Sequence, residues 1–377
     1  MRFDRVAKQA AIATKSGRVA GNRRQLAGKK SGASPLSNGD IAELLAREAE
    51  MVSGNLQRAF RRAARSAFLW PREAWETAAA GESLTSLAGV GPYLEKRIES
   101  WMEKPPVVRP PAVRRDFLTL AKARSALAQN RGWARQLRGD LQMHTIWSDG
   151  SGTIAAMAEA GAMRGYEFVA VTDHSKGLKI AGGIDERALR RQAIEIDQTN
   201  RRSDCQVLKS IEVNLNLRGE GDMDCNALTK LDLVLGSFHS SLRTKEDQTS
   251  RYLAALRNHD IHILGHPRGR VYNFRLGLTA DWPCVFAEAT KLDKALEIDC
   301  YPDRQDLNIA LLKIARREGT RISLGTDAHH PWQLEFIELG LAAAWIAKIP
   351  AGRIINFLAL LQVNKWIASL RSTRRAG

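Results

Sequence analysis

Cysteine is scarce in this sequence and is never paired. The 377 residues contain four cysteines, Cys205, Cys225, Cys284 and Cys300, and no two of them form a CxxC motif. Such wide separation argues against a disulfide framework and against a zinc ribbon, and it favours a reducing compartment.

Long hydrophobic runs are also missing. No stretch reaches the length of a membrane span, and the first residues, 1–5, lead into no apolar core. Neither a transmembrane helix nor a secretory signal is therefore expected. We expect a soluble cytoplasmic protein, and hydrophobic residues at 44% are enough for a barrel-sized domain and a smaller one.

Negative charge is in short supply in the first third of the chain. Residues 1–139 hold 26 Lys+Arg against 12 Asp+Glu, so they carry +14 of the total +16. Residues 140–377 hold 31 against 29 and are close to neutral. This division indicates a polyanion-binding part followed by a part that does chemistry. A basic solvated surface explains the charge equally well.

Composition divides the chain into four segments. Residues 1–35 are basic, with little apolar periodicity, and are predicted to be a disordered tail. Residues 36–104 have helical patterns, and 105–135 are a Pro-rich linker with an entry helix. Residues 136–377 alternate strand and helix patterns and are predicted to form the catalytic domain.

Helical spacing in the second segment places arginines along one helix. Asn38 or Asp40 can cap a first helix, and a second helix follows from about Gln57. Its arginines either form an exposed stripe on a packed helix or face phosphates. They are Arg58, Arg61, Arg62 and Arg65.

A Gly-Val-Gly turn at 89–91 joins two predicted helices, around Leu84 and Leu94. Glycine lets the backbone approach a ligand, and the second helix would start with exposed N–H groups that suit a phosphate. A plain helical turn with a glycine cap is the alternative. The segment resembles a helix-hairpin-helix, a DNA-binding element without sequence preference, and this implies DNA contacts at Gly89, Gly91 and Lys96.

Seven short apolar runs between residues 136 and 329 each end on His, Asp or Glu. Strand–helix repeats with strands in one direction form a parallel barrel or sheet, and functional groups collect at the C-terminal strand ends. Imidazoles and carboxylates on one rim can hold two or three divalent metals. The endings are Gln142-Met143-His144, Asp173-His174, Glu212, His239, His266, Glu297 and Asp327-Ala328-His329.

These residues resemble the PHP (polymerase and histidinol phosphatase) superfamily over about 136–370, and in particular the PHP domains of bacterial family X DNA polymerases. The resemblance rests on the SDG after His144, the GHPRGR of 265–270, and Glu297 with Asp303-Arg304 beyond it. It implies an α/β fold, a distorted seven-stranded (βα)7 TIM-like barrel around a trinuclear metal site. Residues 38–103 resemble the small N-terminal DNA-binding domain of those polymerases.

The resemblance also implies the metal ligands. Its three metal sites share eight residues, with Glu212 bridging the first two sites. The first site is His144, Glu212 and Asp327. The second is Glu212, His239 and His266. The third is Asp149, His174 and His329.

Gln142 departs from the common His-x-His of the first motif, and an amide is a weaker ligand than an imidazole. We therefore expect two or three divalent metals, Mn²⁺ or Zn²⁺, with iron as a further option. Arg268 and Arg270 are predicted to clamp the substrate phosphate. His262 is interpreted as structural because it does not end a strand. Asp173 is expected to orient a ligand or close a turn.

The polymerase part of that family has no counterpart here. Nucleotidyl transfer needs clustered carboxylates, and residues 104–135 between the two matching parts offer Asp116 alone. The leading hypothesis is a DNA phosphodiesterase, a 3′-5′ exonuclease or 3′-end-processing repair enzyme without polymerase activity. DNA ends or gaps would be its partner, and the sequence indicates no protein partner. The alternatives are a small-molecule phosphatase of histidinol-phosphatase type and a non-catalytic DNA-binding scaffold.

Overall fold

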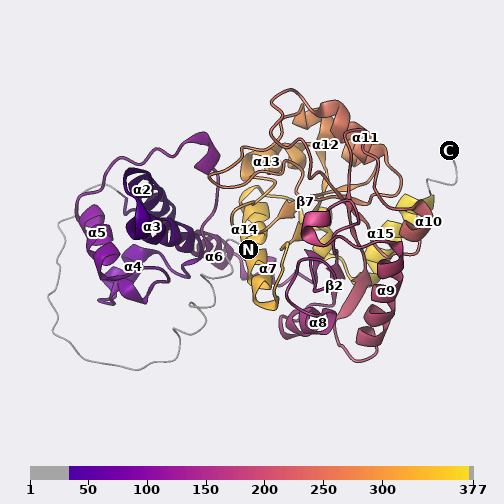
Figure 1. Cartoon of the computed structure of the whole chain (residues 1–377), viewed down its shortest axis with the longest axis horizontal. Helices are drawn as coiled ribbons and strands as arrows, with labels where there is room; N and C mark the ends of the chain where they lie inside the picture. The colour runs from indigo at the N-terminus through magenta and orange to yellow at the C-terminus, as the bar shows by residue number, and fades with distance from the viewer. Residues whose placement is uncertain (1–33, 373–377) are drawn as a thin grey trace. The chain divides into compact units, whose positions relative to one another are not determined.

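The computed structural model describes residues 34–372, which are arranged as two compact units with a boundary between Ser125 and Ala126 (Figure 1). The tail predicted for residues 1–35 lies outside the described residues, apart from its last two. No helix in residues 34–372 is both long enough and apolar enough to cross a membrane.

Helices make up the first unit, and Ser37, rather than Asn38 or Asp40, caps the first of them. The Ser37 hydroxyl accepts from the Asp40 N–H at 3.2 Å, and the Asp40 carboxylate accepts from the Ser37 N–H at 3.0 Å. Asn38 is fully buried instead, because its side chain binds the Arg72 carbonyl and the Ala74 N–H. The elements are α2 (Asn38–Met51), α3 (Gly54–Ser66), η2 (Ala67–Leu69), α4 (Ala74–Ala79), η3 (Leu84–Ser86), α5 (Pro92–Glu103), η4 (Ala112–Arg114) and α6 (Leu120–Ala128), which runs across the boundary.

The Pro-rich segment is attached to the first unit. Arg114 donates from Nε to Glu43 Oε2 at 2.7 Å and from Nη1 to Glu50 Oε1 at 2.6 Å. Glu43 is 3% exposed, so loss of Arg114 would leave a buried carboxylate with the more distant Arg47, whose Nε lies 3.6 Å away, and would destabilise the first unit. The predicted linker is therefore anchored to α2 in its first half.

Parallel strands form the framework of the second unit, as the repeat predicts. Within residues 34–372 eight strands form two sheets, in the orders β1-β2-β3 and β4-β5-β6-β7-β8. Every pair of neighbours is parallel, so all C-terminal strand ends within a sheet share one edge. The strands are β1 (Gly139–Met143), β2 (Phe168–Val171), β3 (Gln206–Lys209), β4 (Glu212–Asn214), β5 (Leu235–Ser237), β6 (Ile263–Leu264), β7 (Ala295–Asp299) and β8 (Arg321–Gly325).

Residues 34–372 do not form the closed seven-stranded barrel that the resemblance implied. Residues 210–211 interrupt one predicted strand, and single bridges between His174 and Glu212 and between Met143 and Ala328 link the two sheets. Asn356 explains the gap between β1 and β8. Its amide nitrogen donates to the Gly139 carbonyl at 2.9 Å and to the Leu324 carbonyl at 2.8 Å, and its oxygen accepts from the Leu324 N–H. A side chain thus occupies backbone groups that would otherwise pair the two strands.

Helices surround these strands (Figure 1). A C-terminal helix, α15, packs Val363, Trp366 and Ile367 against the first residues of several strands, among them Phe168 and Ala295. It therefore covers the N-terminal strand ends. The elements are α7 (Arg131–Ala134), α8 (Ile154–Met163), η5 (Lys179–Ala181), α9 (Glu186–Asn200), α10 (Cys225–Leu228), α11 (Thr249–Arg257), α12 (Trp282–Lys291), α13 (Ile309–Glu318), η6 (Pro331–Phe336), α14 (Ile337–Ile346), η7 (Ala351–Arg353), η8 (Ile355–Phe357) and α15 (Leu360–Ser372).

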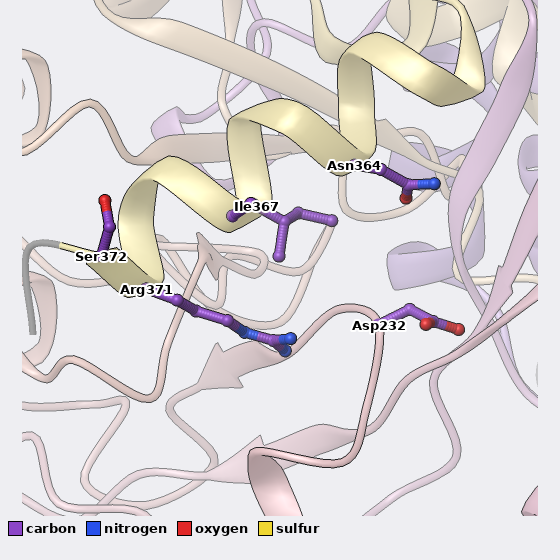
Figure 2. A pocket seen from close by; sticks show the side chains of 6 residues that line it. Asp232, Asn364, Ile367, Arg371 and Ser372 are labelled. Atoms are coloured by element: carbon purple, nitrogen blue, oxygen red, sulfur yellow. The ribbon is translucent and has the colours of Figure 1, made fainter.

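A pocket lies beside α15, between Asp232 and the helix residues Asn364, Ile367 and Arg371 (Figure 2). Arg371 donates to the Leu231 carbonyl, which closes one side of it. Asp232 precedes β5, so this pocket belongs to the N-terminal strand ends, whereas the predicted functional residues follow the C-terminal ends. It is not the candidate site.

His262 is structural, and it should make stability depend on pH. It is 2% exposed, its Nδ1 accepts from the Val234 N–H, and burial lowers its pKa to about 3. A free histidine titrates near 6.5. Between pH 6.5 and 3, His262 is therefore protonated in the unfolded chain but stays neutral in the native protein. The contribution of neutral His262 to the free energy of unfolding is fully present above pH 6.5. It decreases as the pH falls, by up to about 1.4 kcal/mol per pH unit.

Urea unfolding at pH 7 and pH 5 measures this effect. We expect the loss of unfolding free energy between the two pH values to be smaller in His262→Gln than in the wild type by about 2 kcal/mol. His259→Gln, a change at an exposed histidine, is the matched control and should follow the wild type. Equal losses in the wild type and His262→Gln would contradict the assignment.

Candidate metal centre

All eight residues predicted as metal ligands come together at the C-terminal strand ends of the second unit. The carboxylates come from the junction of β3 and β4, the loop after β1, and the residues after β8. The imidazole of His144 directly follows β1, and the others lie in the first residues of the loops after β2, β5, β6 and β8. The eight are His144, Asp149, His174, Glu212, His239, His266, Asp327 and His329.

Glu212 is the centre of this cluster. Its Oε1 lies 2.7 Å from His266 Nε2 and 3.4 Å from His239 Nε2. Its Oε2 lies 2.9 Å from His174 Nδ1 and 3.6 Å from His144 Nε2. Glu212 is 1% exposed, so one buried carboxylate is surrounded by four imidazoles.

The remaining carboxylates lie on either side of His144. Asp327 Oδ1 is 2.9 Å from His144 Nε2. Asp149 Oδ1 is 3.4 Å from His329 Nε2 and 3.6 Å from His174 Nε2. The His144 ring stacks on His174 at 4.3 Å between centroids, so the two halves of the cluster are continuous.

These donors fit divalent cations. Within residues 34–372, two groups have donor atoms within 4.8 Å of one another, namely His144, Asp149, His174 and His329, and His174, Glu212 and His239. Among the described residues, the buried Nδ1 atoms of His144 and His266 have no hydrogen-bond partner, and Nδ1 of His174 faces the Glu212 carboxylate. The grouping differs from the predicted sets in placing His144 with Asp149 and in giving His174 to both groups. A mixed imidazole and carboxylate set suits Mn²⁺, Zn²⁺ or iron.

Electrostatics keeps the central carboxylate ionised. Burial raises the pKa of Glu212, but His174, His239 and His266 together hold it well below its usual range. Burial also raises the pKa of Asp149, and the hydrogen bond with His329 reverses this and lowers the pKa to about 2. Both side chains are thus anions at neutral pH, as metal ligands must be.

The backbone is strained at two predicted ligands. His266 has φ of 24° and Asp327 has φ of 52°, in the left-handed region that non-glycine residues seldom adopt. Strain of this kind costs about 1–3 kcal/mol per residue and gathers at functional sites. It persists here because the buried surroundings hold both residues.

Neighbouring residues orient the cluster. Asp173 accepts from the Thr145 N–H at 2.8 Å, the Thr145 hydroxyl at 2.6 Å and the Gln192 amide at 2.6 Å, so it closes the turn that carries Asp149. Asn214 Oδ1 lies 3.2 Å from His239 Nδ1, an arrangement that leaves Nε2 of that ring facing Glu212. We did not predict Asn214, although it shares a strand face with Glu212 two residues earlier.

Gln142 is turned away from the predicted ligands. It is fully buried, and its amide nitrogen donates to Glu297 Oε2 at 2.9 Å. Glu297 Oε2 also accepts from the His266 N–H at 2.7 Å. Burial, and then Asp299, raise the pKa of Glu297 well above its usual range. Glu297 therefore holds the His266 backbone and the Gln142 amide and lies outside the predicted ligand set.

A different arginine from the two predicted ones contacts the cluster. Arg268 donates to the carbonyls of Leu276 and Leu278, and its predicted phosphate contact stays a prediction. Arg270 is buried, at 4% exposure, and its predicted phosphate contact stays a prediction. Arg304, in the loop after β7, places Nη1 3.1 Å from Asp327 Oδ2 while its side chain stays 34% exposed. The sequence could have indicated Arg304, because this residue comes soon after a strand whose C-terminal end lies at the cluster.

The residues predicted to bind DNA lie in the first unit and are partly exposed. Arg58, Arg61 and Arg62 are exposed on α3, whereas Arg65 is half-buried. Lys96 is exposed on α5. The stripe therefore comprises three exposed arginines.

The Gly-Val-Gly turn leads into α5 as predicted, but a single 3₁₀ turn, η3, precedes it instead of a helix. The chain is already extended at Leu87, with ψ of 135°. Gly89 has φ of 81°, and a Cβ there would lie 2.8 Å from Ser66 Oγ, so Gly89 is needed for packing. Gly91 precedes α5 without a side-chain cap, and a Cβ there would meet no atom within 4 Å. Only Gly91 can test backbone access without disturbing the fold.

Comparison with known proteins finds relatives of the chain that are named for phosphate chemistry. No family model matches the chain. It is 35% identical over 234 residues to the DNA polymerase/3′-5′ exonuclease PolX of Bacillus subtilis, which covers 62% of this chain and 41% of that protein. It is 31% identical over 205 residues to a probable phosphatase of Photobacterium profundum, which covers 50% of this chain and 77% of that protein. The chain thus spans less than half the length of the Bacillus subtilis protein.

Solved structures are also similar to this chain. One of them is histidinol phosphate phosphatase from Lactococcus lactis in complex with zinc, L-histidinol and phosphate. The TM-score is 0.40 at 17% identity, with 56% of this chain and 94% of that chain covered.

Proposed function

This chain belongs to the PHP superfamily of phosphoesterases, and we propose that it is a metal-dependent phosphodiesterase that trims the 3′ ends of DNA. Hydrolysis of phosphate esters is in line with the names of two relatives, a 3′-5′ exonuclease and a probable phosphatase. The proposal adds the substrate, DNA, and the absence of nucleotide incorporation.

The observation that carries the proposal is the cluster around Glu212, with four imidazole nitrogens within 3.6 Å of one carboxylate. Bound divalent cations would activate water for attack on phosphorus and offset charge on the phosphate oxygens. Asn214 and Asp173 hold the ligands in place, and Arg304 offers a partly exposed guanidinium beside them to a phosphate oxygen. No covalent enzyme intermediate is required.

The first unit supports DNA over a metabolite as the substrate. Residues 1–125, which end with the first unit, hold 23 Lys+Arg against 12 Asp+Glu, a net +11, and α3 exposes three arginines. A small phosphate ester needs no such basic unit, whereas DNA binding without sequence preference depends on it. The 35% identity with a 3′-5′ exonuclease is in line with this reading.

A direct test offers both substrate classes to the same enzyme. The full chain is stripped of metal and then supplied with Mn²⁺ or with Zn²⁺. It is incubated with end-labelled gapped DNA, with DNA and deoxynucleotides, and with histidinol phosphate. We expect metal-dependent shortening from 3′ ends, no extension, and activity that disappears on chelation. Rapid turnover of histidinol phosphate with inert DNA would overturn the proposal.

That outcome would favour a small-molecule phosphatase, the second candidate. The probable phosphatase of Photobacterium profundum, 77% of which is covered by this chain, supports it. A decayed, non-catalytic scaffold is disfavoured because all eight predicted ligands are present and gathered.

A further inference from the structure

The loop that follows β6 forms a short hairpin beside the metal centre. It begins at His266, and Val271 and Arg275 bond to each other through both N–H groups at 2.9 Å. The Tyr272 N–H donates to the Asp303 carbonyl at 2.7 Å. Asp303 precedes Arg304, which contacts Asp327 of the cluster. The hairpin is therefore fixed at the rim of the metal centre.

Phe274 is exposed on this hairpin and has arginines around it. Its exposed fraction is 48%, which is high for a phenylalanine within a folded unit. The guanidinium carbon of Arg243, from the loop after β5, lies 4.5 Å from the ring centroid, and that of Arg275 lies 5.9 Å from it. An aromatic ring framed by guanidinium groups is the combination that proteins use to stack nucleic-acid bases.

Positive charge is concentrated around the ring. Burial lowers the pKa of Arg275, and the nearby charges of Arg304 and Arg243 lower it further, while Asp306 acts in the opposite direction. The guanidinium group of Arg275 is thus close enough to those of Arg304 and Arg243 to be repelled by each. A ligand that carries successive phosphates would relieve this repulsion.

We propose that Phe274, Arg243 and Arg275 form a nucleotide-binding subsite at the rim of the metal centre. The ring stacks on the base of the nucleotide next to the scissile phosphate, and the two arginines pair with the neighbouring phosphates. The inference rests on the proposed function, because a phosphate ester without a second nucleotide would leave the subsite unused.

The test compares a nucleic acid with a small phosphodiester. The full chain with Mn²⁺ and its Phe274→Ala and Phe274→Trp variants are assayed on an end-labelled single-stranded oligonucleotide and on bis(4-nitrophenyl) phosphate. We expect KM for the oligonucleotide to rise by about tenfold or more in Phe274→Ala and to stay near the wild-type value in Phe274→Trp. Turnover of the small diester should change little in either variant.

Two further variants separate stacking from general effects. Leu361→Ala removes another exposed apolar side chain, on α15 at the opposite strand ends, and should behave as the wild type does on both substrates. Arg243→Ala alters an exposed side chain and should flatten the dependence of oligonucleotide KM on salt. It tests the subsite independently if Phe274→Ala folds poorly.

The outcomes are distinguishable. If the wild type cuts the oligonucleotide and Phe274→Ala and Arg243→Ala do so with unchanged KM, the subsite is wrong and the proposed function stands. If the wild type hydrolyses the small diester but neither binds nor cuts any DNA, the proposed function fails and the subsite with it.

Discussion

Replacing Glu212 by glutamine is expected to abolish most of the phosphodiesterase activity. The amide keeps the shape of the side chain but removes the negative charge that four imidazoles surround. Loss of an outer-shell partner alone typically costs 10–100-fold, so loss of the central ligand should lower kcat/KM by about a hundredfold or more. Hydrolysis of bis(4-nitrophenyl) phosphate, which needs no DNA binding, measures this.

Metal content should fall in parallel. Elemental analysis of Glu212→Gln after equilibration with Mn²⁺ should show fewer ions per chain than the wild type, with an unchanged circular dichroism spectrum. Glu167→Gln is the matched control, because Glu167 precedes β2, is 40% exposed and pairs with Arg138 on the surface. Full activity or full metal content in Glu212→Gln would refute the assignment of the cluster.

Neutralising the arginine stripe of α3 should weaken DNA binding while sparing the chemistry. Arg61 and Arg62 are exposed, so Arg61→Ala/Arg62→Ala should fold normally. Loss of two phosphate contacts should lower the slope of log affinity against log salt by about 1.8 and weaken binding by about tenfold or more at low salt. Fluorescence anisotropy with labelled duplex DNA across a salt series measures both quantities.

The same variant separates DNA binding by the first unit from catalysis by the second unit. Because every residue of the metal cluster lies in the second unit, turnover of the small diester should be unchanged. Arg218→Ala, which removes an exposed arginine of the second unit that pairs with Glu220, controls for the loss of charge alone. An unaltered salt slope in the double variant would mean that α3 presents only a solvated surface.

Local sequence pattern was sufficient for the second unit's class and for the position of its chemistry. Apolar runs that end on His, Asp or Glu predict parallel strands with polar ends, and the structure shows parallel strands in two sheets. Parallel strands carry their C-terminal residues to a common edge, which is why His144, His239 and His266 meet although far apart in the chain. The role of these residues as ligands stays a prediction for the metal experiments.

The tertiary structure alone decided which polar side chains contact residues far away in the sequence. Asn356, more than 200 residues after Gly139, occupies backbone groups of β1 and β8 and leaves the predicted barrel open. The Gln142 amide donates to Glu297, and Arg268 donates to a carbonyl of its own loop. Arg304 is the arginine that lies beside Asp327.

The physical reason is the range of the interactions concerned. Strand direction, helix caps and apolar faces depend on residues within a few positions, so the sequence alone determined the α/β class, the edge of the sheets that bears the chemistry and the basic character of the first unit. A buried polar group must find its partner wherever the packed chain supplies one. The position of the Asn356 amide between β1 and β8, the contact of Arg304 with the cluster and the exposure of Phe274 were therefore decided only when the strands and loops packed together.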